Sequence, residues 1–307
     1  MSDDRHPRAG AYAVKKLREL DAVLVETIPR VRDHADDEAI HDLRVAIRRL
    51  RTMLKMTRSL FGRWHSDVVR RAFTDVMRAT GELRDEEVLE ETLADAADDP
   101  SFSHWVKSRS AREKKLRHAV GVRIERGELD RARLLLKAML VFHVDPGRDL
   151  DLSRFARRTV EKARRVVEKR RDVEVADVLG LHELRIAYKE LRYAIELLAE
   201  ALPLDARAML EPSVVFQKRL GEIHDVDAAI ETVTSARHLK PQVKDNALST
   251  LQQTRAKRVA KYLRELDPLG SAAQQVSESG RAGPQQEEAL EKALGEVDAS
   301  TKESLSS

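Results

Sequence analysis

Hydrophobic residues recur at spacings of three and four through most of residues 10–266, and no segment alternates convincingly between hydrophobic and polar positions. This period is typical of amphipathic helices, so the pattern predicts an all-α fold. The predicted helices cover residues 11–28, 37–60, 65–80, 84–97, 102–125, 128–142, 151–171, 179–201, 205–220, 225–238 and 244–266. They are separated by Gly and Pro positions, among them Pro29, Gly62, Gly81, Gly221 and Pro268.

The helical pattern ends near Gly270, where the composition changes to Ser, Gln, Gly and Glu. Residues 271–307 carry three basic and seven acidic residues and few hydrophobic ones. Such a segment has too little hydrophobic surface to bury. The sequence therefore predicts a disordered acidic tail over 271–307, after a folded domain over 8–270.

Three blocks of the sequence occur twice, in the same order and at nearly the same offset. HDLRVAIRRLR at 41–51 aligns with HELRIAYKELR at 182–192, an offset of 141 residues. GELRDEE at 81–87 aligns with GEIHDVD at 221–227, and REKK at 112–115 aligns with RAKR at 255–258. These matches predict an internal duplication with two pseudo-symmetric helical bundles, repeat one over 8–145 and repeat two over 146–270.

The first repeated block has two distinct faces when it is placed on a helix at about 100° per residue. Leu43, Ile47, Leu50 and Leu54 form a hydrophobic stripe that must face a core. A basic stripe runs beside it and consists of His41, Arg44, Arg48, Arg51 and Lys55. The second half repeats both faces, with Leu184, Tyr188, Leu191 and Ile195 facing inward and with His182, Arg185, Lys189 and Arg192 beside them.

Like charges stacked at these spacings repel one another by a few tenths of a kcal/mol per neighbouring pair. The sign of the basic stripe is kept in both copies, whereas Arg49 of the first copy is replaced by Glu190 in the second. An anionic ligand with repeated charges would relieve the repulsion, and Arg is well suited to bind phosphate. The structural alternative is that these cations pair with acidic side chains of neighbouring helices.

Further basic residues extend the candidate site. Arg112, Lys115, Arg255 and Arg258 lie on the last long predicted helix of each half, and Lys218 precedes the second Gly-containing block. Weaker candidates are Lys15, Lys16, Arg49, Arg154, Arg158, Lys162 and Tyr193. If the two halves face each other, these side chains converge on one basic groove or pore.

The acidic residues of the repeated blocks favour a structural role. Asp85 and Asp225 follow a predicted break at Gly, where a carboxylate at a helix start is stabilised by the helix dipole. The pairs Asp85/Glu87 and Asp225/Asp227 leave open a divalent ion, although no metal site and no cofactor is predicted. The dyads His41-Asp42 and His224-Asp225 leave open a metal-dependent phosphohydrolase, but they do not occupy equivalent positions in the two repeats.

The overall composition narrows the possible functions. The chain has no Cys, which excludes a disulfide scaffold, a thiol nucleophile and a Cys-ligated metal. Only 4% of its residues are aromatic, which argues against stacking on single-stranded nucleic acid, although a nucleic-acid-binding helical protein stays an alternative. No hydrophobic run approaches the ~18 residues of a membrane span, so the expectation is a cytoplasmic protein without a membrane partner.

With these blocks taken together, the sequence resembles the CHAD family, the conserved histidine α-helical domain. The resemblance is carried by His41, Arg44, Arg48, Arg49 and Arg51, by His182, Arg185, Lys189, Arg192 and Tyr193, and by the blocks 81–85 and 221–225. It implies one all-helical module of two bundles that binds inorganic polyphosphate without catalysis. It also implies association with polyphosphate granules and with a CYTH-type triphosphatase as a partner. One departure is Arg84 opposite His224, which leaves the role of that position open.

Overall fold

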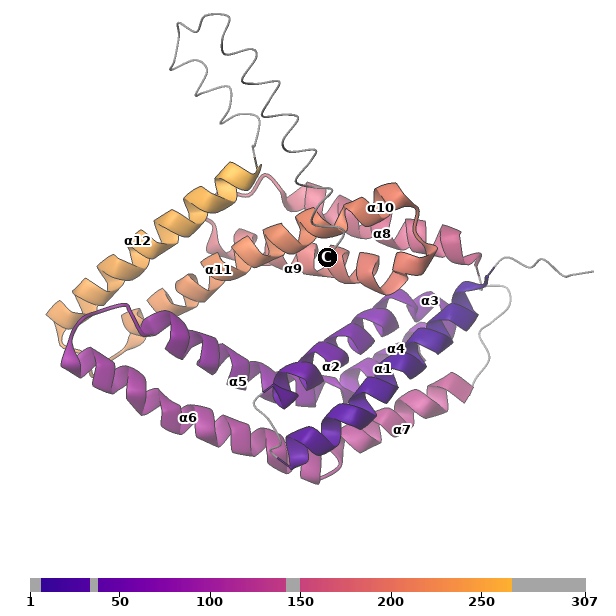
Figure 1. Cartoon of the computed structure of the whole chain (residues 1–307), viewed down its shortest axis with the longest axis horizontal. Coiled ribbons are helices and arrows are strands. Elements are labelled where there is room, and N and C mark those ends of the chain that lie inside the picture. Colours follow the sequence, from indigo (N-terminus) through magenta and orange to yellow (C-terminus); the bar gives the residue numbers. More distant parts are fainter. Residues whose placement is uncertain (1–6, 34–37, 142–149, 267–307) are drawn as a thin grey trace, which may run out of the picture. The chain divides into compact units, whose positions relative to one another are not determined.

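A computed structural model describes residues 7–33, 38–141 and 150–266 (Figure 1). These residues form helices and connecting turns and contain no β-strand, so the prediction of an all-α fold is confirmed for this part of the chain. The helices up to the middle of the chain are α1 (Ala9–Arg32), α2 (Ala39–Met56), α3 (Arg58–Phe61), α4 (Arg63–Ala72), α5 (Thr74–Leu93), α6 (Pro100–Glu125) and α7 (Glu128–Val141). They are followed by α8 (Leu152–Arg170), α9 (Val178–Leu198), the 3-10 helix η1 (Ala199–Ala201), α10 (Leu204–Ala208), α11 (Leu210–Ser235) and α12 (Pro241–Leu266).

The chain divides into two compact units, Met1–Val259 and Ala260–Ser307. Of the second unit the structure describes only the last residues of α12, and the predicted acidic tail over 271–307 lies outside the described residues. The junction of the two predicted repeats also lies outside them. The repeat bounds 8–145 and 146–270 therefore stay predictions.

Three helices begin at an aspartate that caps the exposed backbone N–H groups of the first turn. Asp99 Oδ1 accepts hydrogen bonds from the backbone N–H groups of Ser101 and Phe102, at 2.8 and 3.1 Å. Asp151 caps α8 through Arg154 N at 2.9 Å, and Asp177 caps α9 through Gly180 N at 2.9 Å. These caps fix where α6, α8 and α9 start.

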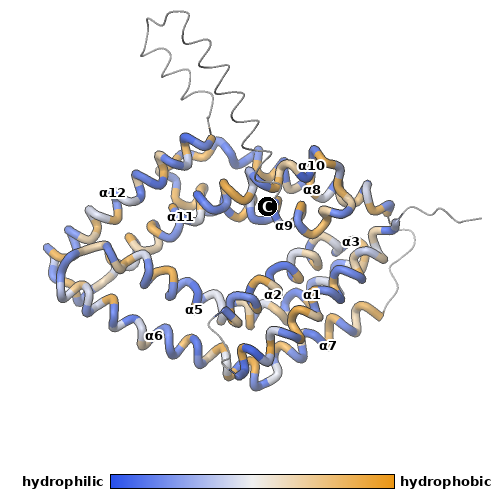
Figure 2. Tube along the Cα trace, viewed as in Figure 1, coloured by the Kyte–Doolittle hydropathy of each residue, from blue (hydrophilic) through white to orange (hydrophobic). Residues whose placement is uncertain are grey.

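The two predicted hydrophobic stripes are buried. Every member of the first stripe on α2 is fully inaccessible, and the members of the second stripe on α9 are at most 7% exposed. Figure 2 shows hydrophobic and hydrophilic residues interspersed along these helices, as expected when one face of each helix packs against a neighbour. The predicted inward-facing positions of both repeated blocks are thus confirmed.

The predicted helix breaks at Gly81 and Gly221 are wrong. Gly81 lies in the middle of α5 and Gly221 in the middle of α11, and the helix continues through both. A glycine costs a helix only about 1 kcal/mol relative to alanine. The burial of neighbours such as Leu83 and Ile223 outweighs this cost.

Other predicted boundaries shift for similar reasons. The helix expected to stop before Pro29 continues to Arg32, because Ile28 and Val31 are buried on the same face. The helix predicted over 37–60 divides into α2 and α3 at Thr57. Gly62 does end α3, with a φ of 83° that side-chain-bearing residues rarely adopt.

Contacts between helices bring the two repeated blocks together. α2 contacts α1, α4, α5 and α9, whereas α9 also packs against α8 and lies along α11 (Figure 1). α5 in turn contacts α11. The helices that carry the repeated sequence blocks, α2 with α5 and α9 with α11, are therefore joined by direct contacts within the first unit.

Candidate functional site

Four cations from the two basic stripes converge where α2 approaches α9. They are Arg44 and Arg48 on α2, and Arg185 and Lys189 on α9. Burial lowers the pKa of Lys189 to about 8, and the charges of Arg48 and Arg185 lower it as well. Burial also lowers the pKa of Arg185; the charge of Asp225 opposes this shift, and the charge of Arg48 adds to it. We call these four residues the cation cluster.

Arg44 is the least exposed member of the cation cluster. The residue is only 8% exposed, and its Nη1 atom has no hydrogen-bond partner among the described residues. Burial lowers the pKa of Arg44 to about 10, and the neighbouring charge of Arg48 acts in the same direction. A buried N–H group without an acceptor is energetically costly.

The glycines of the repeated blocks lie against these guanidinium groups. A Cβ atom added to Gly81 would lie 3.5 Å from Arg44 Nη1, and one added to Gly221 would lie 3.7 Å from Arg185 Nε. At these distances an added Cβ atom would make only an ordinary van der Waals contact, so the site does not require glycine at either position. The two glycines, which were predicted to break helices, instead lie beside guanidinium groups of the cation cluster.

The nearby carboxylates do not neutralise the cation cluster by direct ion pairs. Burial raises the pKa of Asp225, which the charges of Arg185 and Arg258 oppose. Within the described residues, no salt bridge joins Asp85 or Asp225 to a member of the cation cluster. Both aspartates lie inside helices, so the predicted helix-start role is wrong for them.

The outer part of the α2–α9 contact is held by hydrogen bonds and ion pairs. Arg48 Nη1 donates to the hydroxyl of Tyr193 at 3.2 Å, and the Arg192 guanidinium lies over the Tyr193 ring at 5.2 Å. Glu196 accepts from Arg192 Nε at 2.7 Å and lies 3.4 Å from Arg49 Nη2. Arg49 and Arg192 are therefore already paired with a carboxylate, as the structural alternative predicted.

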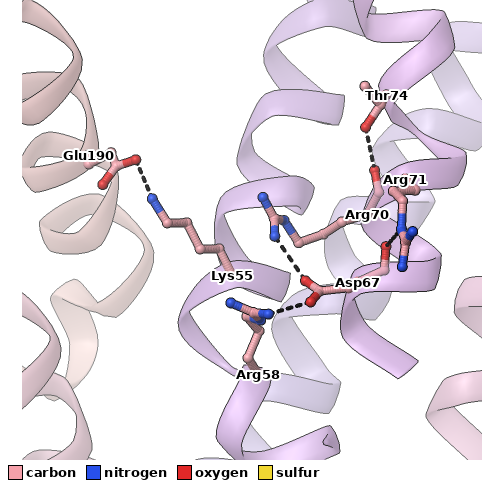
Figure 3. A network of polar contacts seen from close by, with 7 residues as sticks. All are labelled: Lys55, Arg58, Asp67, Arg70, Arg71, Thr74 and Glu190. Carbon is pink, nitrogen blue, oxygen red and sulfur yellow. Dashed lines mark hydrogen bonds and ion pairs between the residues drawn. The ribbon is translucent and has the colours of Figure 1, made fainter. Parts of the chain in front are cut away.

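The C-terminal end of the first basic stripe meets further paired charges. Lys55 is ion-paired with Glu190 of α9, and Figure 3 shows this pair reaching between the two helices. Arg58 and Arg70 share the carboxylate of Asp67, also drawn in Figure 3. Arg51 is half-buried nearby, and burial lowers its pKa with a contribution from Arg70.

Several other predicted site residues are engaged in structural contacts. Arg112 Nε lies 3.0 Å from the buried carboxylate of Glu86. Arg255 pairs with Asp227 at 2.6 Å and donates to the carbonyl of Val175. The remaining pairs are Arg258 with the carbonyl of Glu222 at 2.6 Å, Lys16 with Glu200 at 2.7 Å and Lys15 with Glu19 at 3.8 Å.

The last group of predicted residues is exposed. His41, Lys115 and Lys218 are exposed, and the structure gives none of them an ion pair within the described residues. Arg154, Arg158 and Lys162 are exposed along α8. Neither the exposed group nor the paired residues gather into the cation cluster.

Two histidines and an arginine adjoin the cation cluster. The rings of His182 and His224 lie 4.7 Å apart. Burial lowers the pKa of His224 to about 4, with Arg185 and His182 contributing, and burial also lowers the pKa of His182. Arg84 contributes to the lowered pKa of Arg44, so both residues of the sequence departure, Arg84 and His224, adjoin the site. Arg84 and His224 occupy equivalent positions in the repeated blocks 81–87 and 221–227, and this equivalence is the sequence feature that pointed to them.

The dyad of His41 and Asp42, which left open a metal-dependent phosphohydrolase, is not assembled into a larger site. Asp42 is ion-paired with Arg30 at 2.7 Å, and His41 beside it is exposed. Across residues 7–33, 38–141 and 150–266, no group of three or more His, Asp or Glu side chains is arranged to hold a metal ion. The same residues include no helix that is long and hydrophobic enough to cross a membrane.

Comparison with known proteins assigns the chain to a family. The family model of the CHAD domain matches residues 17–234, more than half of the chain. The chain belongs to the CHAD family. CHAD domains are known for polyphosphate binding and are generally non-catalytic. The resemblance drawn from the repeated histidine and arginine helix is thereby confirmed.

Two solved structures share the fold of this chain. The crystal structure of the CHAD domain from the plant Ricinus communis is 20% identical and has a TM-score of 0.61, with 87% of this chain and 90% of that chain covered. PptA from Streptomyces chartreusis is 12% identical and has a TM-score of 0.65, with 85% and 99% covered. At these identities the likeness concerns the fold. No curated protein matches the chain.

Proposed function

We propose that this CHAD domain binds inorganic polyphosphate at the cation cluster without catalysing its turnover. The observation that carries the proposal is the convergence of Arg44, Arg48, Arg185 and Lys189 at one place, where none of them is ion-paired with a carboxylate of the described residues. Bringing these cations together in a partly buried site is unfavourable in the free protein. A polyanion with one charge on each repeating unit reverses that cost.

The proposed ligand fits the chemistry of these side chains. Guanidinium groups donate paired hydrogen bonds to phosphate oxygens, and Lys189 adds a compact charge. His182 donates a hydrogen bond in its neutral form through a ring nitrogen, and its Nδ1 has no partner among the described residues. We propose that the paired cations, such as Arg112 and Arg255, support the structure around the site and do not contact polyphosphate directly.

We also propose that the two halves descend from one duplicated bundle. Three features support this proposal: the repeated blocks, the contact of Gly81 with Arg44, and the equivalent contact of Gly221 with Arg185. In each case the stripe arginine of one helix lies on the glycine of the facing helix. The polyphosphate site would then be formed by two copies of one motif.

A binding titration tests the proposal. Polyphosphates of graded length should bind, with an affinity that falls by orders of magnitude between roughly 50 and 200 mM salt, whereas free phosphate binds weakly. Long polyphosphate should displace duplex DNA at equal phosphate concentration. The reverse order of preference would favour the nucleic-acid alternative, and phosphate release that depends on a divalent ion would revive the phosphohydrolase alternative.

A matched pair of variants separates the cation cluster from general basicity. Replacing Arg44, Arg48, Arg185 and Lys189 together by Gln should weaken polyphosphate binding by at least about a hundredfold. The control replaces four exposed cations outside the cluster by Gln: Arg18, Lys107, Lys137 and Arg157. Both variants lose the same charge, so equal losses of affinity would contradict the assignment, provided that circular dichroism shows both to be helical.

A further inference from the structure

We propose that a hollow bordered by α2, α3, α8 and α9 binds a small soluble amphipathic anion, an organic phosphate with a hydrophobic group. The hollow has a volume of about 560 Å³. This size lies within the range of about 300–1,000 Å³ that is typical of small-molecule sites. Its lining contains no member of the cation cluster, so the inference does not depend on polyphosphate binding.

The walls of the hollow are mainly hydrophobic. Phe155 and Ala194 are buried, and Met56, Ala163 and Val166 are half-buried. The hydroxyls of Thr52 and Thr159 in the walls already donate to backbone carbonyls one turn earlier, at 2.9 and 2.8 Å, whereas the exposed Ser59 keeps a hydroxyl that is free of partners among the described residues. The surface therefore offers a ligand hydrophobic contact over most of its area.

Positive charge stands at the edge of these walls. Arg158 and Lys162 line the hollow four residues apart on α8, which places them on one side of the helix. Both are exposed, and neither has an ion pair or hydrogen bond in the part of the chain that the structure describes. The third cation, Lys55, is paired with Glu190, the hollow's acidic residue (Figure 3).

The combination selects the class of ligand. An inorganic polyanion would meet Arg158 and Lys162 but would gain nothing from the hydrophobic walls, and a neutral hydrophobic molecule would leave both cations unused. A molecule with an alkyl or aryl group and a phosphate group satisfies both features. Its phosphate would accept charge-assisted hydrogen bonds from Arg158 and Lys162.

The first experiment is a calorimetric titration of the full chain with octyl phosphate, beside 1-octanol and inorganic phosphate. Octyl phosphate should bind at one site at least about tenfold more tightly than either control compound, because only it combines hydrophobic burial with charge pairing. Equal binding of inorganic phosphate would overturn the proposal by showing that the hydrophobic walls contribute nothing. Equal binding of octanol would do so by showing that the cations contribute nothing.

Variants locate the site. Arg158→Gln should weaken octyl phosphate binding by about tenfold. Arg157→Gln, with the same change on the same helix but outside this lining, should leave it within about twofold. Ala163→Leu fills the hollow with a residue of similar helix propensity and should weaken binding by at least about tenfold. Unchanged binding in both Arg158→Gln and Ala163→Leu would place the ligand elsewhere.

Competition separates this site from the proposed polyphosphate site and from a membrane contact. The quadruple Gln variant of the cation cluster should keep its affinity for octyl phosphate, and long polyphosphate should not displace octyl phosphate from the unmodified protein. Displacement would make the hollow part of the polyanion site and overturn the proposal. Binding to phosphatidic acid vesicles that is lost in Arg158→Gln would identify a membrane surface instead of a soluble ligand.

Discussion

At the scale of single residues, the ionisation of Lys189 should make both the stability of the fold and the proposed binding of polyphosphate depend on pH. Its lowered pKa of about 8 results from burial and from the charges of Arg48 and Arg185. The folded chain thus holds this proton more weakly than the unfolded chain, where the pKa is near 10.5. Since the unfolded state binds more protons between these values, the ligand-free protein gains stability from this group as pH rises from about 8 to 10.5.

Polyphosphate binding should change with pH in the opposite direction. If polyphosphate binds at the proposed site, it pairs with the charged form of Lys189, so affinity should fall by about tenfold between pH 7 and pH 9. Lys189→Arg keeps its charge over this range and should lose much less affinity. The measurement is a titration at constant salt, and an equally large decrease in the arginine variant would contradict the assignment to Lys189.

At the scale of secondary-structure elements, the repeated helices were predictable and their breaks were not. The three- and four-residue spacing identified the buried faces of α2 and α9, because burial of one face follows directly from the hydrophobic period. Gly81 and Gly221 misled the prediction, since glycine weakens a helix but does not end it when its neighbours are buried. Whether a helix continues through glycine depends on its packing against neighbouring helices, and the local sequence pattern carries no information about that packing.

Substitutions at Gly81 separate helix propensity from access to the cation cluster. A Cβ atom would make an ordinary contact with Arg44 at 3.5 Å. Gly81→Ala should therefore stabilise the protein by about 0.5–1 kcal/mol in urea unfolding and keep polyphosphate binding. Gly81→Leu should displace the Arg44 guanidinium and weaken binding by about tenfold. Full binding by the leucine variant would show that the position of Arg44 is unimportant.

At the scale of the molecule, a hydrophobic cluster and two ion pairs join the two halves of the first unit. One hydrophobic cluster combines Leu89, Leu93 and Phe102 from the first half with Val226, Val233 and Leu251 from the second. The ion pairs of Lys55 with Glu190 and of Arg49 with Glu196 add contacts between α2 and α9. The two halves therefore share a core rather than meeting only through their charges.

This shared core predicts cooperative unfolding of the two halves. Leu93 is fully buried in the cluster, and Leu93→Ala should lower the free energy of unfolding by about 3 kcal/mol. Because the cluster draws on both halves, circular dichroism and tryptophan fluorescence should still report one coincident transition. Two separate transitions, with only the first half destabilised, would show that the halves fold independently.

The sequence alone predicted the candidate site only in part, because a pattern within one helix does not show which charges are paired across helices. The periodic pattern found Arg44, Arg48, Arg185 and Lys189, because one helix suffices to define a stripe. It also included Arg112 and Arg255, whose carboxylate partners lie on other helices. Pairing between helices depends on tertiary packing, so a stripe of cations predicts a basic face but not which of its members stay available.

Across the part of the chain that the structure describes, no carboxylate is ion-paired with the cation cluster, and this has a consequence for measurement. A cluster of positive charges in solution attracts anions from the buffer. A polyanion that binds there must displace these counterions. An apparent dissociation constant for this protein is therefore an exchange constant between two anions. Values obtained in phosphate, sulfate or chloride will differ systematically, and comparison between laboratories requires the same background electrolyte.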